Sequence, residues 1–313
     1  MRLSLAFFSF TALITASSLH AQTTVFSDNF NRAALTTGAP TTYMIPVTAG
    51  DGGAQIVSSS FLRLTNDSDH AVANASGRVM VSGLTSSYAA PYNTTLGLNT
   101  GQVVEWSANM KYSGPSNGTQ PGAFGLGSYA TAIVLASDRS DFTASDAQGY
   151  AIALGSGGTI DPVRLIRFTN GLTGNLNITD IVTSNPSALA TVNNFASVRV
   201  RFDAITSQWS LFVRDDGASA WGDPTTVTTQ IGTATVDTTL TNISLANFGF
   251  LWSYGGTPAD QTTDFDNYRV TVAPVTEPAT ILAVSGLSLC AIGCVRRCRK
   301  RVRQIFTAEV LPA

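Results

Sequence analysis

Between Val104 and Tyr112 the chain alternates strictly between apolar and polar residues, and this alternation restricts the fold more than any other feature. Successive side chains of a β-strand point to opposite faces of a sheet, so alternation is typical of a strand with one buried face. The body of the chain shows no comparable period of 3.6 residues, which an amphipathic helix would need. We therefore expect half-buried strands, with these side chains in the core: Val104, Trp106, Ala108, Met110 and Tyr112.

Two further alternating segments are separated only by a short turn, as in a β-hairpin. Val198–Asp203 alternates, Ala204–Ser207 can form the turn, and Trp209–Arg214 continues the pattern up to Asp215–Gly217. An antiparallel hairpin would place the Val, Phe and Trp side chains of both strands on one face. The sequence therefore predicts a hairpin whose Val/Phe/Trp face points into the core.

Other short segments have the composition of strands and are separated by polar turns such as 114–118 and 155–158. Together with the three above, about a dozen short strands indicate an all-β antiparallel sandwich. The further candidates are Val25–Phe30, Phe61–Thr65, Ala130–Ala136, Tyr150–Leu154, Val163–Thr169, Asn177–Thr183, Thr226–Thr233, Ser244–Trp252 and Phe265–Val272.

The end of the chain has the pattern of a single transmembrane helix. Ala279–Val295 contains no charged residue and would form a helix of roughly 25 Å, at the short end of what spans a bilayer. A buried helix of a soluble domain is the alternative, but the basic block that follows directly argues against it. This block should stay cytoplasmic and leave everything before Glu277 on the far side of the membrane. It consists of Arg296, Arg297, Arg299, Lys300, Arg301 and Arg303.

The start of the chain has the pattern of a secretory signal peptide. Arg2 supplies a positive charge, Leu3–Ile14 an apolar stretch, and Leu19–Ala21 a small-residue cleavage site before Gln22. We therefore expect export through the inner membrane of a bacterium, with the Sec export machinery as a partner.

The segment 275–303 resembles a PEP-CTERM sorting signal, which is recognised by an integral-membrane transpeptidase-like protein called exosortase. The family pattern is Val-Pro-Glu-Pro, one transmembrane helix and an Arg-rich end. This chain has Val275, Glu277 and Pro278, with Thr276 at the position of the first proline, and it continues for residues 304–313 beyond the basic block. The resemblance covers about a tenth of the chain. It implies processing by an exosortase-like enzyme and delivery to the cell envelope, the cell surface or an extracellular polysaccharide matrix.

The two ends of the body resemble those of a concanavalin A-like (laminin G-like) jelly roll, a fold of lectins and glucanases. Phe26–Arg32 opens the body and Asp264–Val272 closes it, with the predicted hairpin between them. The resemblance implies that the first and last strands lie side by side in one sheet. The expected organisation is a signal peptide (1–21), a lectin-like β-sandwich domain (22–273), a sorting signal (274–303; motif 275–278, helix 279–295, basic block 296–303) and a tail (304–313).

Few residues of the body suit acid–base or nucleophilic catalysis. Glucanases of this fold carry two glutamates on one strand, whereas residues 22–273 contain one glutamate, Glu105, and one histidine, His70. The three cysteines, Cys290, Cys294 and Cys298, all lie near the end of the chain. We therefore expect a non-catalytic protein. A carbohydrate-active enzyme, a glycoside hydrolase or lyase that uses aspartates on the same fold, is the alternative.

The charge of the body argues against nucleic acid as a partner. Residues 22–273 contain eleven Lys/Arg and eighteen Asp/Glu, a formal charge of −7. A nucleic-acid-binding domain would be expected to present a basic surface. It is the lectin-like resemblance that implies extracellular polysaccharide as a partner.

Two small groups of residues are candidates for binding. Asp67 with Asp69, and Asp264 with Asp266, offer the hard oxygen ligands that calcium prefers, although Asx turns explain the same residues. No other cofactor is expected. Trp221 and Tyr254 lie beside Gly and Pro in expected loops and are candidates for stacking on a sugar ring. The other tryptophans are expected in the core: Trp106, Trp209 and Trp252.

Mass measurement of the mature protein tests the sorting prediction. If the tail is processed, the mature chain begins near Gln22 and lacks the residues after the Glu277–Pro278 region. A mature chain that keeps its tail would indicate permanent anchoring by the helix 279–295. An intact polypeptide free in the cytosol would contradict both outcomes.

Overall fold

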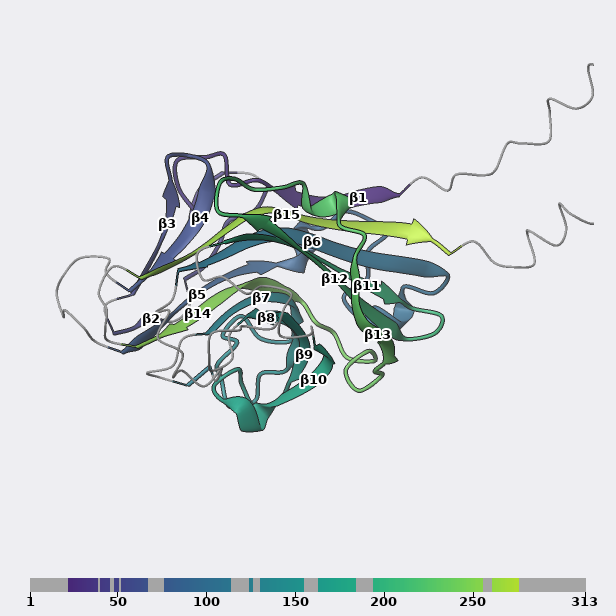
Figure 1. Cartoon of the computed structure of the whole chain (residues 1–313). Helices are drawn as coiled ribbons and strands as arrows, with labels where there is room; N and C mark the ends of the chain where they lie inside the picture. Colours follow the sequence, from purple (N-terminus) through teal and green to yellow (C-terminus); the bar gives the residue numbers. More distant parts are fainter. Residues whose placement is uncertain are drawn as a thin grey trace, which may run out of the picture. The chain divides into compact units, whose positions relative to one another are not determined.

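The body of the chain forms two β-sheets packed face to face (Figure 1). The computed structural model describes residues 22–38, 40–45, 48–50, 52–66, 76–113, 124–125, 130–154, 163–183, 194–255 and 261–275. Ala21–Pro274 forms one compact unit. Every strand pair is antiparallel, so the predicted all-β antiparallel sandwich is confirmed.

Within these described ranges, the first sheet has eight strands and the second has seven. In spatial order the first contains β13 (Gln230–Val236), β12 (Gln208–Gly217), β11 (Phe195–Asp203), β6 (Gln102–Ser113), β15 (Thr262–Pro274), β4 (Phe61–Thr65) and β3 (Gly53–Val57), while β1 (Thr23–Asp28) also pairs with β15. The second contains β10 (Ile178–Thr183), β9 (Val163–Phe168), β8 (Gly149–Leu154), β7 (Ala130–Ser137), β14 (Asn247–Tyr254), β5 (Gly77–Leu84) and β2 (Thr48–Ala49). Short 3₁₀ helices occur at η1 (Thr85–Ser87), η2 (Leu96–Leu98), η3 (Asn175–Asn177) and η5 (Pro224–Thr226).

The first and last strands of the body are neighbours, as the jelly-roll resemblance implies. β1 runs antiparallel to β15, from the pair Thr23–Val272 to the pair Asp28–Tyr268 (Figure 1). β15 also pairs with β6 and β4. Because β6 in turn pairs with β11, the first and last strands of the body and the predicted hairpin β11–β12 belong to one sheet.

The main core lies between the sheets and follows the predicted alternation. On β6 the side chains of Val104, Trp106, Ala108 and Met110 are buried, whereas the burial of Tyr112 lies outside the described residues. Trp106 and Trp209 stack with ring centroids 5.9 Å apart. The predicted Val/Phe/Trp face of the hairpin is thus confirmed as part of the core: Val198, Val200, Phe202, Trp209, Leu211 and Val213.

The second sheet is buried on both faces. Strands β7, β8 and β14 are buried along their whole length. A smaller cluster covers the outer face and includes Met80, Phe142 and Leu172, from a strand and from two connecting segments. A strand with two apolar faces shows no alternation, so β7, β8 and β14 were predicted from composition and flanking turns alone, and β5 was missed.

Several predictions about the ends of the chain fall outside the described residues. These are the signal peptide, motif residues Thr276, Glu277 and Pro278, the helix 279–295 and the basic block 296–303. Val275 directly follows β15. Within the described ranges, no helix has the length and apolar character needed to cross a membrane.

Gly249 provides a test of the packing within the second sheet. A Cβ atom at this position of β14 would lie 2.0 Å from the backbone oxygen of Val81 on β5. We expect Gly249→Ala to lower the free energy of unfolding by at least about 2 kcal/mol, because the neighbouring backbone would have to move. Gly174→Ala is the matched control, since nothing lies within 4 Å of its added Cβ. Urea unfolding measures both; equal stability of the two variants would contradict this packing.

Candidate binding site

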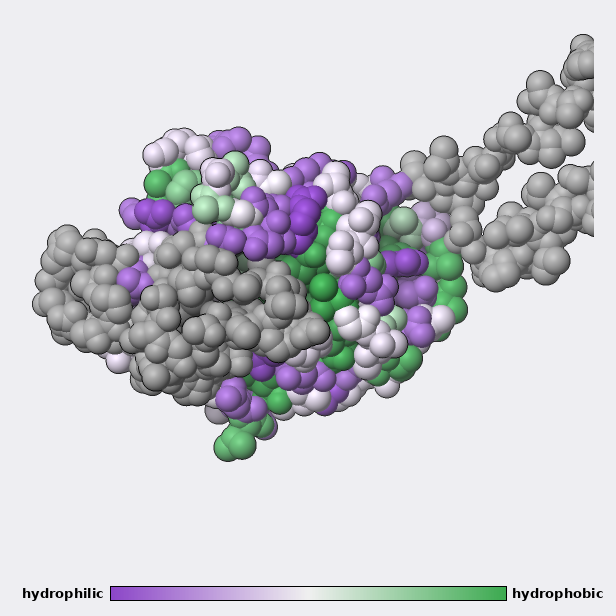
Figure 2. All heavy atoms as spheres, viewed as in Figure 1, coloured by the Kyte–Doolittle hydropathy of each residue, from purple (hydrophilic) through white to green (hydrophobic). Residues whose placement is uncertain are grey.

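The outer face of the first sheet is polar because the same alternation that buries the apolar side chains turns the polar ones outward. Strand pairing aligns Arg214 of β12 with Ser197 of β11, Ser197 with Asn109 of β6, and Asn109 with Asp266 of β15. These four side chains therefore form a row across the sheet. Figure 2 shows hydrophilic residues gathered over the β1 and η5 side of the molecule.

The segment between β12 and β13 is held against this row by Gly222. The Gly222 N–H donates to Asp216 Oδ2 (2.9 Å), and the Gly222 carbonyl accepts from Asn109 Nδ2 (2.9 Å). Arg214 Nε donates to Asp216 Oδ1 (2.6 Å), and Ser197 Oγ donates to Asp216 Oδ2 (2.5 Å). A Cβ on Gly222 would lie 2.2 Å from the Arg214 guanidinium, so a larger residue would require the Arg214 and Asp216 side chains to move. The position of the segment is thus fixed by its backbone.

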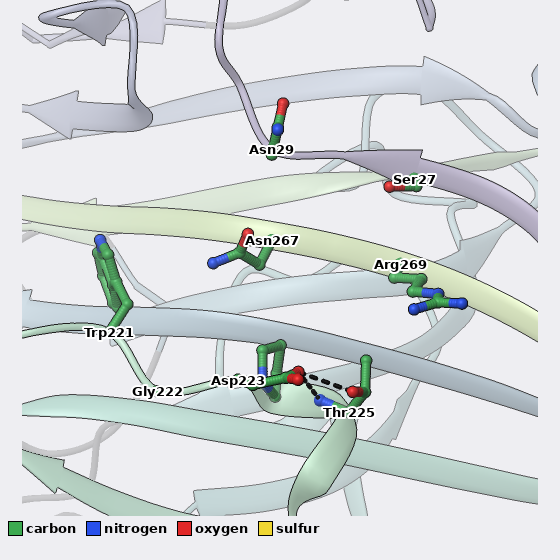
Figure 3. Close-up of a pocket in the computed structure, with 9 residues that line it drawn as sticks. Ser27, Asn29, Trp221, Gly222, Asp223, Thr225, Asn267 and Arg269 are labelled. Atoms are coloured by element: carbon green, nitrogen blue, oxygen red, sulfur yellow. Dashed lines mark hydrogen bonds between the residues drawn. The ribbon is translucent and has the colours of Figure 1, made fainter.

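Asp223 begins the short helix η5 and carries a negative charge beside the sheet. Its Oδ1 accepts from the backbone N (2.9 Å) and from Oγ1 (2.7 Å) of Thr225 (Figure 3). These hydrogen bonds, with smaller contributions from Arg214 and Arg269, lower the pKa of Asp223. Its carboxylate is therefore ionised at neutral pH.

An irregularity in β15 turns Asn267 toward the same region. The register with β6 shifts between Asp266 and Arg269, and Asn267 has a left-handed φ of 50°. Asn267 Nδ2 donates to Asn109 Oδ1 (2.8 Å), and the Asn267 N–H donates to Asp266 Oδ1 (2.7 Å). Burial, together with the charge of Asp28, raises the pKa of Asp266 to about 6.

These elements surround a partly open cavity of about 370 Å³ (Figure 3). Asn267 and Arg269 of β15 lie between the 221–225 segment on one side and the end of β1 on the other (Figure 3). The lining offers one indole ring, two amides, a carboxylate, a guanidinium and hydroxyl groups. It consists of Ser27, Asn29, Trp221, Gly222, Asp223, Pro224, Thr225, Asn267 and Arg269.

Trp221 belongs to a strip of three half-buried rings on the outer face of the first sheet. The ring of Phe195 lies 4.4 Å from that of Trp221 at a steep angle, and the ring of Phe61 lies 6.5 Å away. Lys111 Nζ is 4.4 Å from the centre of the Phe195 ring, within the range of a cation–π interaction. We call Trp221, Phe195 and Phe61 the aromatic strip.

The two residues predicted to stack on a sugar have different environments. Trp221 lines the cavity and is half-buried. Tyr254 is fully buried, with its ring 5.0 Å from that of Trp252, so it cannot stack on a ligand at the surface. This interpretation of Tyr254 was wrong because the residue ends β14 inside the core. The predicted core positions of Trp106, Trp209 and Trp252 are confirmed.

The aspartates predicted for calcium are not assembled into a metal site in the described part of the chain. Asp264 is buried and accepts two hydrogen bonds from Arg63, at 2.8 Å and 2.9 Å. A guanidinium in this position already neutralises the charge that calcium would need. Asp67 and Asp69 lie outside the described residues. Within the described ranges, no three His, Cys, Asp or Glu side chains converge closely enough to hold a metal ion.

Most polar residues of the site were not predicted from the sequence. Asn109, Ser197 and Asp216 hold the segment 221–225 in place, and Asn267 and Arg269 line the cavity. Alternation indicates that the polar residues of these strands point outward from the sheet. It does not indicate which strands pair with one another, so it could not bring these residues together into a site.

No family model matches the sequence, and no curated protein matches it. Similar solved structures include arcelin-5, a lectin-like defense protein from Phaseolus vulgaris (11% identity; 81% of this chain and 99% of that chain covered; TM-score 0.48). They also include lectin II from Ulex europaeus (15% identity; 80% and 100% covered; TM-score 0.48) and the exoplasmic/lumenal domain of VIP36 in a metal-free form (11% identity; 82% and 95% covered; TM-score 0.47). With these TM-scores below 0.5, the similarities identify neither a family nor a ligand.

Asp216→Ala tests whether the polar row holds the cavity wall. The substitution leaves Arg214, Ser197 and the Gly222 N–H without their shared acceptor, so we expect a loss of about 2 kcal/mol in the free energy of unfolding. The Gly222 amide should also exchange hydrogen faster. Asp146→Ala is the matched control, because its ion pair with Arg139 is more than half exposed, with side chains 60% and 56% accessible. Its loss should stay below about 1 kcal/mol; equal losses in the two variants would contradict the assigned role of Asp216.

Proposed function

We propose that this protein is exported from a bacterial cell and binds carbohydrate without catalysis, through the cavity beside Trp221. The observation that carries the proposal is an accessible indole ring surrounded by amide, hydroxyl, carboxylate and guanidinium groups. A sugar presents an apolar ring face that can pack on an aromatic side chain, and hydroxyls that need donors and acceptors. The concanavalin A-like jelly-roll type belongs to the same proposal, supported by the pairing of β1 with β15.

The rigidity of the cavity wall supports a binding role. Gly222 is fixed through both its N–H and its carbonyl, and Asp223 is fixed by Thr225. A site that is already ordered loses little conformational entropy when a ligand binds, so more of the contact energy appears as affinity. The cavity therefore suits recognition of a ligand at an exposed surface.

The ends of the chain supply the proposed route to the outside. Residues 1–21 would direct Sec-dependent export, and residues 275–303 would be recognised by an exosortase-like membrane transpeptidase. The helix 279–295 would hold the protein in the inner membrane, transiently or permanently, with the basic block inside. The body would then act at the cell surface or in an extracellular polysaccharide matrix.

The carboxyl groups near the cavity do not favour the enzymatic alternative. Glycoside hydrolases use two carboxyl groups that flank the bond to be cleaved. Of the residues that line the cavity, Asp223 alone carries a carboxyl group. Glu105 lies elsewhere on the same face and is paired with Arg199 at 2.9 Å. Binding without turnover is therefore the better account of the site.

Glycan-array binding of the wild type and Trp221→Ala tests this function. We expect the variant to bind any glycan recognised by the wild type at least about tenfold more weakly, because the ring would supply the main apolar contact. Phe212→Ala is the matched control: Phe212 is a half-buried ring on the outer face of the same sheet, outside the cavity lining. Its affinity should be unchanged.

Two outcomes would contradict the proposal. Absence of wild-type binding to every glycan tested would remove the carbohydrate-binding role. Release of new reducing ends from a bound polysaccharide would replace it with the carbohydrate-active enzyme considered above.

A further inference from the structure

Arg269 differs from most cations of the body because it forms no direct ion pair with a carboxylate within the described residues. Its recorded hydrogen bonds all go to the hydroxyl of Thr24, including one from Nε at 3.1 Å. A guanidinium has five N–H donors, so several remain available to a ligand. Seven other arginines form ion pairs with carboxylates: Arg32, Arg63, Arg139, Arg164, Arg167, Arg199 and Arg214.

The position of Arg269 makes these remaining donors relevant to the cavity. The residue is half-buried on β15 and lines the cavity (Figure 3). The nearest acidic lining residue, Asp223, forms no ion pair with it in the structure and already uses Oδ1 to accept from Thr225. The cavity therefore presents a cation that is held by Thr24, feels the charge of Asp223, and forms no direct ion pair with it.

The aromatic strip extends the recognition surface beyond the cavity. Phe195 packs against Trp221 on the outer face of the first sheet, and Lys111 lies over the Phe195 ring. Lys111 has no ion pair with a carboxylate among the described residues, since its strand neighbour Asp264 is held by Arg63. A linear ligand that continues from the cavity along the strip would pass a second available cation.

We propose that the cavity binds a segment of an acidic polysaccharide built of uronic acid units, with the carboxylate of one unit on Arg269 and the ring of another unit on Trp221. This inference rests on the proposed carbohydrate-binding function and names its ligand class. A planar carboxylate can accept two parallel hydrogen bonds from a guanidinium, which gives orientation as well as affinity. The amides of Asn29 and Asn267 are placed to bond the sugar hydroxyls, and the polymer continues along Phe195 past Lys111.

The test uses the full-length protein in detergent with polygalacturonate and with the same polymer after chemical reduction of its carboxyl groups. Isothermal titration calorimetry at physiological salt should show at least about tenfold tighter binding of the acidic polymer, the scale of one charge-assisted hydrogen-bonded contact. Arg269→Gln should abolish this preference, so that the acidic and the reduced polymer bind with similar affinity. Arg269→Lys should keep part of the preference, because the positive charge remains.

Two further variants separate a specific contact from general electrostatics. Arg201→Gln removes the same charge from the outer face of the same sheet, where Arg201 is exposed and outside the cavity lining. Its affinity for polygalacturonate should change by less than about twofold, because β6 separates its strand β11 from β15 and salt screens an exposed charge at that separation. Asp223→Asn can keep the hydrogen bonds from Thr225 while removing a like charge, so it should tighten binding of the acidic polymer. A sulfated galactan, which carries its negative charge on sulfate instead of carboxylate groups, serves as a third ligand and should bind more weakly than polygalacturonate.

The outcomes distinguish this inference from the function on which it rests. If Trp221→Ala loses both polymers but Arg269→Gln keeps the preference, the carboxylate contact is wrong and the carbohydrate-binding function stands. Equal losses in Arg201→Gln and Arg269→Gln would overturn the inference in favour of diffuse attraction, and tighter binding of the sulfated polymer would overturn the preference for carboxylates. If the wild type binds none of the polymers or other glycans, the proposed function fails as well. Unfolding curves that match the wild type establish that each variant is folded.

Discussion

The pairing of β1 with β15 is the contact on which the candidate site depends. It brings the beginning and the end of the body together, so that Ser27 and Asn29 lie beside Asn267 and Arg269. β15 in turn pairs with β6, and Asn109 of β6 donates a hydrogen bond to the segment that carries Trp221. Three distant parts of the sequence therefore form one cavity only when this sheet is complete. Loss of the terminal pairing would remove the site without changing any of its residues.

Polar groups on the outer face of the first sheet form a connected hydrogen-bond network. Asp216 and Asn109 are buried or nearly so, and each has hydrogen-bond partners from more than one element. Buried polar groups are costly when unpaired, so such a network tolerates few alternative arrangements. The apolar core defines how the sheets pack, whereas this network defines where the 221–225 segment lies. The shape of the cavity follows from the second of these constraints.

Alternation predicted the strands that have one polar face, whereas strands buried on both faces depended on composition and flanking turns. β6, β11 and β12 were predicted because their outer faces are polar, and β7, β8 and β14 because they are short apolar segments between polar turns, but β5, which packs against a cluster on each side, was missed. A strand expected at Thr226–Thr233 begins later, since Pro224–Thr226 forms η5. Trp221 was identified because it lies beside Gly and Pro in an expected loop, but Asn109, Ser197 and Asp216 come together only through strand register. Sequence composition does not contain that register, and the same limitation led to the wrong interpretation of the buried Tyr254.

The charge of the whole body and the charge at the cavity have different consequences. A formal charge of −7 repels any polyanion at long range, which is consistent with excluding nucleic acid as a partner. At physiological ionic strength this repulsion is screened over about 8 Å, so contacts within the cavity decide affinity. Seven arginines contribute little there because carboxylates already neutralise them. A domain of this kind can therefore be acidic overall and still select an acidic ligand, provided that the few cations without a carboxylate partner lie where the ligand binds.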